Sequence, residues 1–182
     1  MTLTRSIERD LSKLADPEHY LFTLRDLSGL VPGRSEGALK ALVGRLTADG
    51  VLDRLCRGLY LYPAVHFPSD LILYHAAARL RAAELCYLSL ESVLSDAGVI
   101  SQIPMNWITL MTSGRSGEIT CGRFGTIEFV HTRKSPKALA EALVYDSRCR
   151  LWRATMAQAM IDMRDARRSM ELIDREALNE LV

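Results

Sequence analysis

The clearest structural signal in this sequence is SEGALKALVGRLTADGVLDRLCRGLYLY, residues 35–62. Its first half predicts a helix over 36–48, because apolar residues recur at helical spacing and form one inward face. That face consists of Leu39, Leu42, Val43 and Leu46. Ser35 is a good N-cap, and Gly50 suits the left-handed residue that ends a helix. Two strand-like runs follow, 51–56 and 59–62, and Arg57-Gly58 between them predicts a hairpin turn.

Upstream of this stretch, leucine spacing predicts two more helices, over 3–15 and 19–31, and then a turn over 31–34. Three short helices followed by a hairpin within about sixty residues is the layout of a winged helix-turn-helix. Pro63 and Pro68 bracket a short stretch after the hairpin. We therefore expect a first domain over residues 1–66 and a second over 67–182.

The second domain has a mixed pattern. Helices are expected over 69–82, 89–98, 135–144 and 151–181, and strands over 107–112, 118–121 and 126–132. The predicted fold class is therefore α+β, with an N-terminal winged helix-turn-helix and a mixed α+β C-terminal domain. Four methionines at helical spacing after residue 155 are most simply a core stripe, and a homo-oligomer interface is the alternative.

The outward face of the 36–48 helix suggests contact with DNA. The major groove admits one helix, and small residues let it approach closely while basic residues reach the phosphates. The candidate contact residues, from this helix, its start and the hairpin, are Arg34, Ser35, Gly37, Lys40, Ala41, Gly44, Arg45, Arg54 and Arg57. Alternatively, the small residues only permit tight packing against another helix. Glu36, Asp49 and Asp53 dilute the basic patch, which favours dimers or higher oligomers over strong binding by one copy.

Overall charge says little about nucleic acid. The chain has 182 residues and a net charge of +1; residues 1–62 hold nine Lys/Arg against eight Asp/Glu. No apolar run is long enough to span a membrane, and the charged N-terminus is not a signal peptide, so we expect a cytoplasmic protein. The four cysteines and four histidines are dispersed. We therefore expect reduced thiols, no metal site and no cofactor.

Little in the sequence indicates an enzyme. Two carboxylate pairs, Glu91 with Asp96 and Asp162 with Asp165, fall on helices and are expected on solvated helix faces. The loop 112–117 is rich in glycine and serine but lacks the Gly-Lys-Ser/Thr ending of a phosphate-binding loop. We expect an ordinary connection between strands there.

Two stretches resemble the AbiEi-type antitoxins of type IV toxin–antitoxin systems. One is the hairpin region DGVLDRLCRGLY, residues 49–60, and the other is YLSLESVLSDAGVI, residues 87–100. The resemblance implies a repressor that binds inverted repeats and autoregulates a toxin operon. It also implies a nucleotidyltransferase-like partner toxin, whose neutralisation does not require direct contact. A different class of function stays open, namely a protein-interaction module that sequesters a partner without binding DNA.

Overall fold

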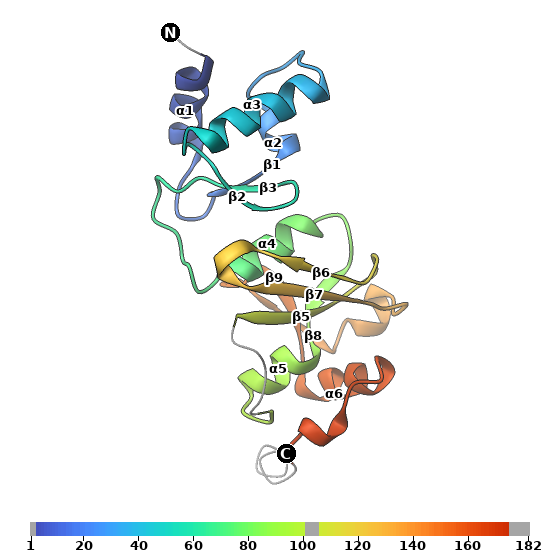
Figure 1. Cartoon of the computed structure of the whole chain (residues 1–182). Coiled ribbons are helices and arrows are strands. Elements are labelled where there is room, and N and C mark those ends of the chain that lie inside the picture. The colour runs from blue at the N-terminus through green and yellow to red at the C-terminus, as the bar shows by residue number, and fades with distance from the viewer. Residues whose placement is uncertain (1–2, 101–105, 175–182) are drawn as a thin grey trace. The chain divides into compact units, whose positions relative to one another are not determined.

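The computed structural model describes residues 3–100 and 106–174. Its contacts divide the chain into two compact units, Met1–Ile72 and Leu73–Val182. Figure 1 shows helices and a small sheet in the first unit, and a larger sheet with helices in the second. The predicted α+β class is thereby confirmed. The role of each unit stays a prediction.

The first unit consists of three helices and a three-stranded antiparallel sheet. In chain order these are α1 (Leu3–Leu14), β1 (Leu21–Thr23), α2 (Leu24–Gly29), α3 (Glu36–Ala48), β2 (Asp53–Cys56) and β3 (Leu59–Leu61). The strand order is β1-β3-β2. The expected helix over 36–48 and the hairpin that follows it are confirmed, with β2 starting two residues later than expected.

The helix expected over 19–31 is wrong at its start. Residues Leu21–Thr23 form β1 instead, and Leu21 pairs with Leu61. A capping box fixes where α2 begins: Thr23 Oγ1 accepts the N–H of Asp26 at 3.2 Å, and Asp26 Oδ2 accepts the N–H of Thr23 at 2.7 Å. Sheet pairing with a strand about forty residues away thus overrides the helical leucine spacing.

The core of the first unit lies between the helices and the sheet. The predicted inward face of α3 is buried at all four positions, and Ile7 and Leu11 of α1 pack into the same core. The chain beyond β3 stays attached to this unit, because Phe67 stacks on Tyr20 with ring centroids 5.3 Å apart. The first unit therefore ends at Ile72, six residues later than the boundary expected from the two prolines.

The second unit is built on a six-stranded mixed sheet with strand order β6-β7-β5-β4-β9-β8. Its strands are β4 (Cys86–Leu88), β5 (Trp107–Thr112), β6 (Gly117–Thr120), β7 (Thr126–His131), β8 (Leu143–Asp146) and β9 (Leu151–Ala154). Its helices are α4 (Ile72–Leu80), α5 (Leu90–Asp96) and α6 (Met156–Asp165), with short 3₁₀ turns at Gly122–Phe124, Pro136–Leu139 and Met170–Leu172. Figure 1 shows α5 and α6 together beside this sheet. The loop 113–116 joins β5 to β6, as expected.

Two helices expected in this unit are corrected. Residues 135–144 form a 3₁₀ turn and then the start of β8. The helix expected over 151–181 begins with β9, in which Leu151 and Ala154 are buried and Trp152 is exposed. Thr155 caps the helix that follows by accepting the N–H of Gln158 at 3.3 Å, and α6 ends at Asp165. Residues 175–181 of the expected helix lie outside the described residues.

One member of each carboxylate pair is withdrawn from solvent, contrary to expectation, namely Glu91 and Asp162, whereas Asp96 and Asp165 are exposed as expected. Asp162 is fully buried and accepts hydrogen bonds from Ser89 Oγ at 2.6 Å, Lys134 Nζ at 2.7 Å and Gln158 Nε2 at 2.8 Å. Burial alone would lower the pKa of Lys134, but its hydrogen bonds to Asp162 and Asp165 outweigh burial and raise that pKa. These partners join α6 to the segments after β4 and β7.

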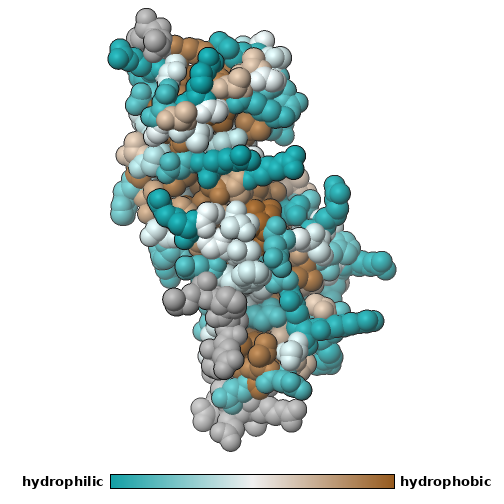
Figure 2. Space-filling view, in the orientation of Figure 1, coloured by the Kyte–Doolittle hydropathy of each residue, from teal (hydrophilic) through white to brown (hydrophobic). Residues whose placement is uncertain are grey.

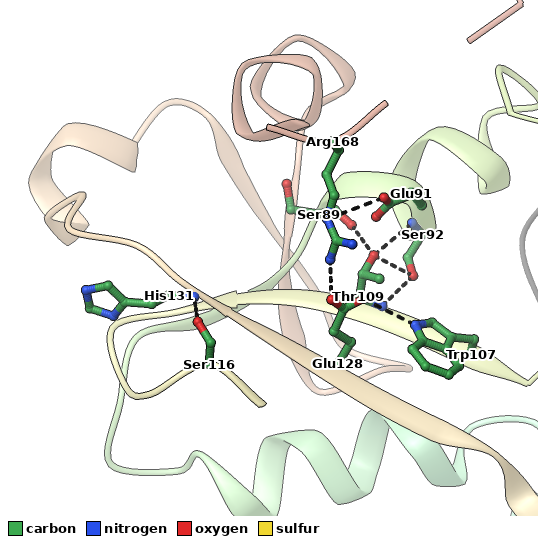
Figure 3. A network of polar contacts seen from close by, with 9 residues as sticks. All are labelled: Ser89, Glu91, Ser92, Trp107, Thr109, Ser116, Glu128, His131 and Arg168. Atoms are coloured by element: carbon green, nitrogen blue, oxygen red, sulfur yellow. Dashed lines mark hydrogen bonds and ion pairs between the residues drawn. The ribbon is translucent and has the colours of Figure 1, made fainter. Parts of the chain in front are cut away.

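A second polar network joins α5 to the sheet. Arg168 forms ion pairs with Glu91, at 3.5 Å, and with Glu128 of β7 (Figure 3). Asp96, at the end of α5, pairs with Arg153 of β9 at 2.8 Å. The acidic residues of α5 therefore have specific structural partners. No helix in the described part of the chain is both long and apolar enough to cross a membrane.

Candidate nucleic-acid interface

Helix α3 is held at both ends by its own sequence. Ser35 Oγ accepts the N–H of Ala38 at 3.3 Å, which caps the first turn. At the other end Gly50 adopts a φ of 72°, the left-handed conformation that ends a helix at low cost in glycine. Because the apolar face packs into the core, the opposite face of α3 is directed outward.

The outward face of α3 carries mainly small and basic residues, together with Glu36 in the first turn. All six residues predicted there are exposed: Gly37, Lys40, Ala41, Gly44, Arg45 and Ala48. A Cβ added at Gly37 or at Gly44 would meet no atom within 4 Å. The alternative that these glycines permit packing against another helix therefore finds no such neighbour among the described residues. In Figure 2, apolar residues appear on the visible surface only as patches among hydrophilic side chains.

The β2–β3 hairpin stands next to this face. Gly58 has a φ of 81°, so the tip turns tightly beside Arg57. Arg54 lies across from Tyr60 in the hairpin, and both arginines are exposed. A groove of about 760 Å³ separates the hairpin from α3. It is lined by Leu24, Glu36, Lys40, Gly44, Thr47, Arg54, Arg57, Gly58 and Tyr60.

Most basic groups of this surface are not engaged within the protein. Across residues 3–100 and 106–174, Arg34, Arg45, Arg54 and Arg57 form no ion pair with the chain's own carboxylates. Lys40 is the exception, because its Nζ lies 2.5 Å from Glu36 Oε1 on the preceding turn. The hydrogen bond and the charge of the lysine hold the pKa of Glu36 below its usual value. A phosphate that binds Lys40 therefore approaches the Glu36 carboxylate and is repelled by it.

The structure brings four of the nine predicted contact residues together in the groove: Lys40, Gly44, Arg54 and Arg57. The other five are exposed but do not line it: Arg34, Ser35, Gly37, Ala41 and Arg45. Whether any of the nine contacts DNA stays a prediction. The Ser35 oxygen already accepts one hydrogen bond from the helix, and its hydroxyl proton remains available as a donor.

Five residues that line the groove were not among the predicted contacts: Leu24, Glu36, Thr47, Gly58 and Tyr60. Thr47 lies three residues after Gly44 and seven after Lys40, which places all three on one helix face, so its position was predictable. Tyr60 lies opposite Arg54 because the register shifts between Arg54 and Cys56; a regular two-residue hairpin would place Tyr60 opposite Leu55. Leu24 was not predicted to line the groove, because the helix was expected to begin at residue 19 and not at Leu24. Arg25, the next residue, is exposed and adds a cation at this end of α2.

The sequence was compared with models of known protein families and with curated proteins, and one family model matches this part of the chain. No curated protein matches the sequence. A family model described as "Transcriptional regulator, AbiEi antitoxin" matches residues 9–63. The match begins within α1 and ends just after β3, so it covers the helices, the groove and the hairpin of the first unit. Over residues 9–63 the chain is therefore similar to the AbiEi antitoxin family of transcriptional regulators.

Proposed function

We propose that this protein is a DNA-binding repressor in which α3 enters the major groove and the β2–β3 hairpin contacts the flanking backbone. The observation that carries this proposal is the outward face of α3. Two glycines lie there in open space, at a cost of up to about 1 kcal/mol each relative to alanine in a helix interior. A close-fitting external partner explains why that cost is tolerated.

The charges beside these glycines suit a polyanion. Arg54 and Arg57 face solvent across the groove from Lys40 and have no acidic partner in the described part of the chain. A phosphate backbone seated there would meet guanidinium groups that need not leave an existing ion pair. Guanidinium groups bind phosphate oxygens with two parallel hydrogen bonds, so they also orient the duplex.

The wider role follows the family resemblance. We propose that the protein is the antitoxin of a type IV toxin–antitoxin pair, that it represses its own operon by binding inverted repeats as a homo-oligomer, and that it works in the cytoplasm. The functional partner is then a nucleotidyltransferase-like toxin, whose neutralisation does not require direct contact. Cofactors and catalysis have no part in this proposal.

The test is a titration of the protein's own promoter fragment at several salt concentrations. Each phosphate contact that is removed flattens the slope of log K against log salt by about 0.9. Replacing Arg54 and Arg57 together by alanine should flatten the slope by about 1.8 without unfolding the protein. The matched control removes Arg5 and Arg9, two exposed cations of α1 that do not line the groove.

Charge reversal at the hairpin tip sharpens the result. Arg57→Glu should bind more weakly than Arg57→Ala, because it adds repulsion from phosphates to the lost attraction. Equal effects of the groove pair and the α1 pair would contradict the proposed interface. No promoter binding by the wild-type chain, with stable recovery of a bound partner protein, would favour the protein-interaction module instead.

A further inference from the structure

One edge of the sheet in the second unit exposes an apolar side chain on each face, with Arg153 of β9 across from the exposed Val144. This edge is β8, whose hydrogen-bonded neighbour in the described part of the chain is β9 alone. Consecutive side chains of a strand point to opposite faces, yet Val144 is 64% exposed and Tyr145 is 52% exposed. Trp152, across from Tyr145 on β9, is 47% exposed, and the two ring centroids lie 5.4 Å apart.

The edge also lacks the usual protection of an exposed strand. Edge strands commonly carry lysine, proline or a bulge that discourages pairing with another chain. β8 has no lysine or proline, and its register with β9 is regular. Its one charged residue is Asp146. The Oδ1 atom of Asp146 accepts hydrogen bonds from the backbone N–H groups of Arg148 and Cys149, at 2.9 and 3.1 Å. The opposite edge differs, because β6 exposes Gly117, Glu118 and Thr120.

The backbone of β8 shows which groups are available for pairing. Thr155 N–H donates to Ala142 O at 2.9 Å, just before the strand begins. Hydrogen-bonded and non-hydrogen-bonded pairs alternate along an antiparallel ladder, so Val144 and Asp146 exchange bonds with β9. The N–H and C=O groups of Leu143 and Tyr145 therefore point away from β9, toward the open edge.

We infer that β8 pairs with β8 of a second copy of this chain, antiparallel, about a two-fold axis that passes between the two Val144 residues. A two-fold axis perpendicular to the sheet keeps each side chain on its own face, so Val144 can lie opposite its own counterpart. Leu143 then lies opposite Tyr145 of the second copy. This register uses every outward backbone group of both strands.

Side chains and charges fit this register. The two Val144 side chains meet at a non-hydrogen-bonded position, where side chains approach most closely. On the other face, Leu143 of one copy extends the Tyr145–Trp152 pair of the other. Glu141 precedes β8 and Arg148 follows it, and both are exposed without an ion pair in the described part of the chain. Antiparallel pairing brings the acidic end of each strand toward the basic end of the other, as an isologous interface requires.

The first experiment measures the oligomeric state of the full chain by sedimentation without DNA, so its outcome does not depend on the proposed function. The wild-type chain should dimerise. Val144→Lys and Val144→Glu should each weaken the dimer by at least about tenfold, because like charges meet across the axis. An equimolar mixture of the two variants should restore the dimer. Ile161→Lys is the matched control, since Ile161 is another exposed apolar residue, on α6, and should leave the dimer unchanged.

The second experiment tests the register by cross-linking. Cα atoms of a non-hydrogen-bonded pair lie about 4.5 Å apart, within the range of roughly 4.4–6.8 Å that a disulfide spans. Val144→Cys should therefore form a covalent dimer on mild oxidation, whereas Tyr145→Cys, which faces Leu143, should not. The four native cysteines are buried and give little background. A monomeric wild-type chain, a dimer that survives Val144→Lys, or equal cross-linking at both positions would overturn the inference.

Discussion

Replacing Gly44 by alanine should stabilise the protein and weaken its binding to DNA. Gly44 lies in the interior of α3, and an added Cβ meets nothing within 4 Å. Alanine is about 1 kcal/mol more favourable than glycine at such a position. For a unit of this size, that gain raises the melting temperature by about 4–8 °C. Calorimetry of the full chain, with attention to the transition of the first unit, measures the effect.

The same methyl group would stand in the groove that we assign to DNA. Inserting a methyl into a close-packed contact typically costs about 1–3 kcal/mol. This corresponds to a loss of about 5- to 150-fold in affinity for the promoter. Gly29→Ala is the matched control, because Gly29 is also in open space but does not line the groove, and its promoter affinity should not change. A Gly44→Ala variant that is more stable yet binds as tightly as wild type would refute the close approach of α3 to DNA.

Three further predictions concern charge and burial. Glu36→Gln should strengthen promoter binding roughly 1.5- to 5-fold, because it releases Lys40 from its ion pair and removes an acidic group from the groove. A binding titration measures this effect, and weaker binding would count against the prediction. Lys134→Met should destabilise the second unit by about 3–5 kcal/mol in urea unfolding, since it leaves the buried Asp162 carboxylate without its cation, whereas a change below about 1 kcal/mol would show that the pair contributes little. Burial raises the pKa of Cys86 to about 12 and of Cys149 to about 11, so native protein should resist iodoacetamide at pH 8, as mass spectrometry can show. The unfolded thiols ionise first, so the unfolding midpoint should fall as the pH rises above about 9, and a flat profile to pH 11 would contradict this assignment.

The parts of the fold that follow from local sequence were predictable. In α3, the N-cap, the apolar spacing and the terminal glycine lie within sixteen residues, and each acts through near neighbours. The hairpin likewise depends on a two-residue turn and its flanking strands. The exposed face of α3 follows from the same periodicity, because fixing the buried face fixes the opposite one.

The missed elements depend on distant partners. β1 forms because residues 21–23 pair with β3, and β8 forms because residues 143–146 pair with β9; both strands are too short for alternation to be distinctive. Burial of Asp162 depends on Lys134 and Ser89, which lie 28 and 73 residues earlier in the chain. Helical spacing alone predicts that Asp162 lies on a polar, solvated helix face. It does not reveal that Lys134, which follows β7, lies next to this carboxylate.

If the proposed operator is an inverted repeat, its symmetry would link the weak charge of the first unit to the exposed apolar edge of the second unit. Residues 1–62 carry a net charge of only +1, so one copy has a limited electrostatic attraction for DNA. A two-fold pair presents two recognition helices to two half-sites, whose own two-fold symmetry matches that of the protein. Once one helix is bound, the second binds at a high effective concentration, which can raise the overall affinity by about 10²–10⁴-fold without new base contacts. A pairing strand outside the DNA-binding unit would therefore supply the affinity that the charge of each unit lacks, and would make repression depend on protein concentration.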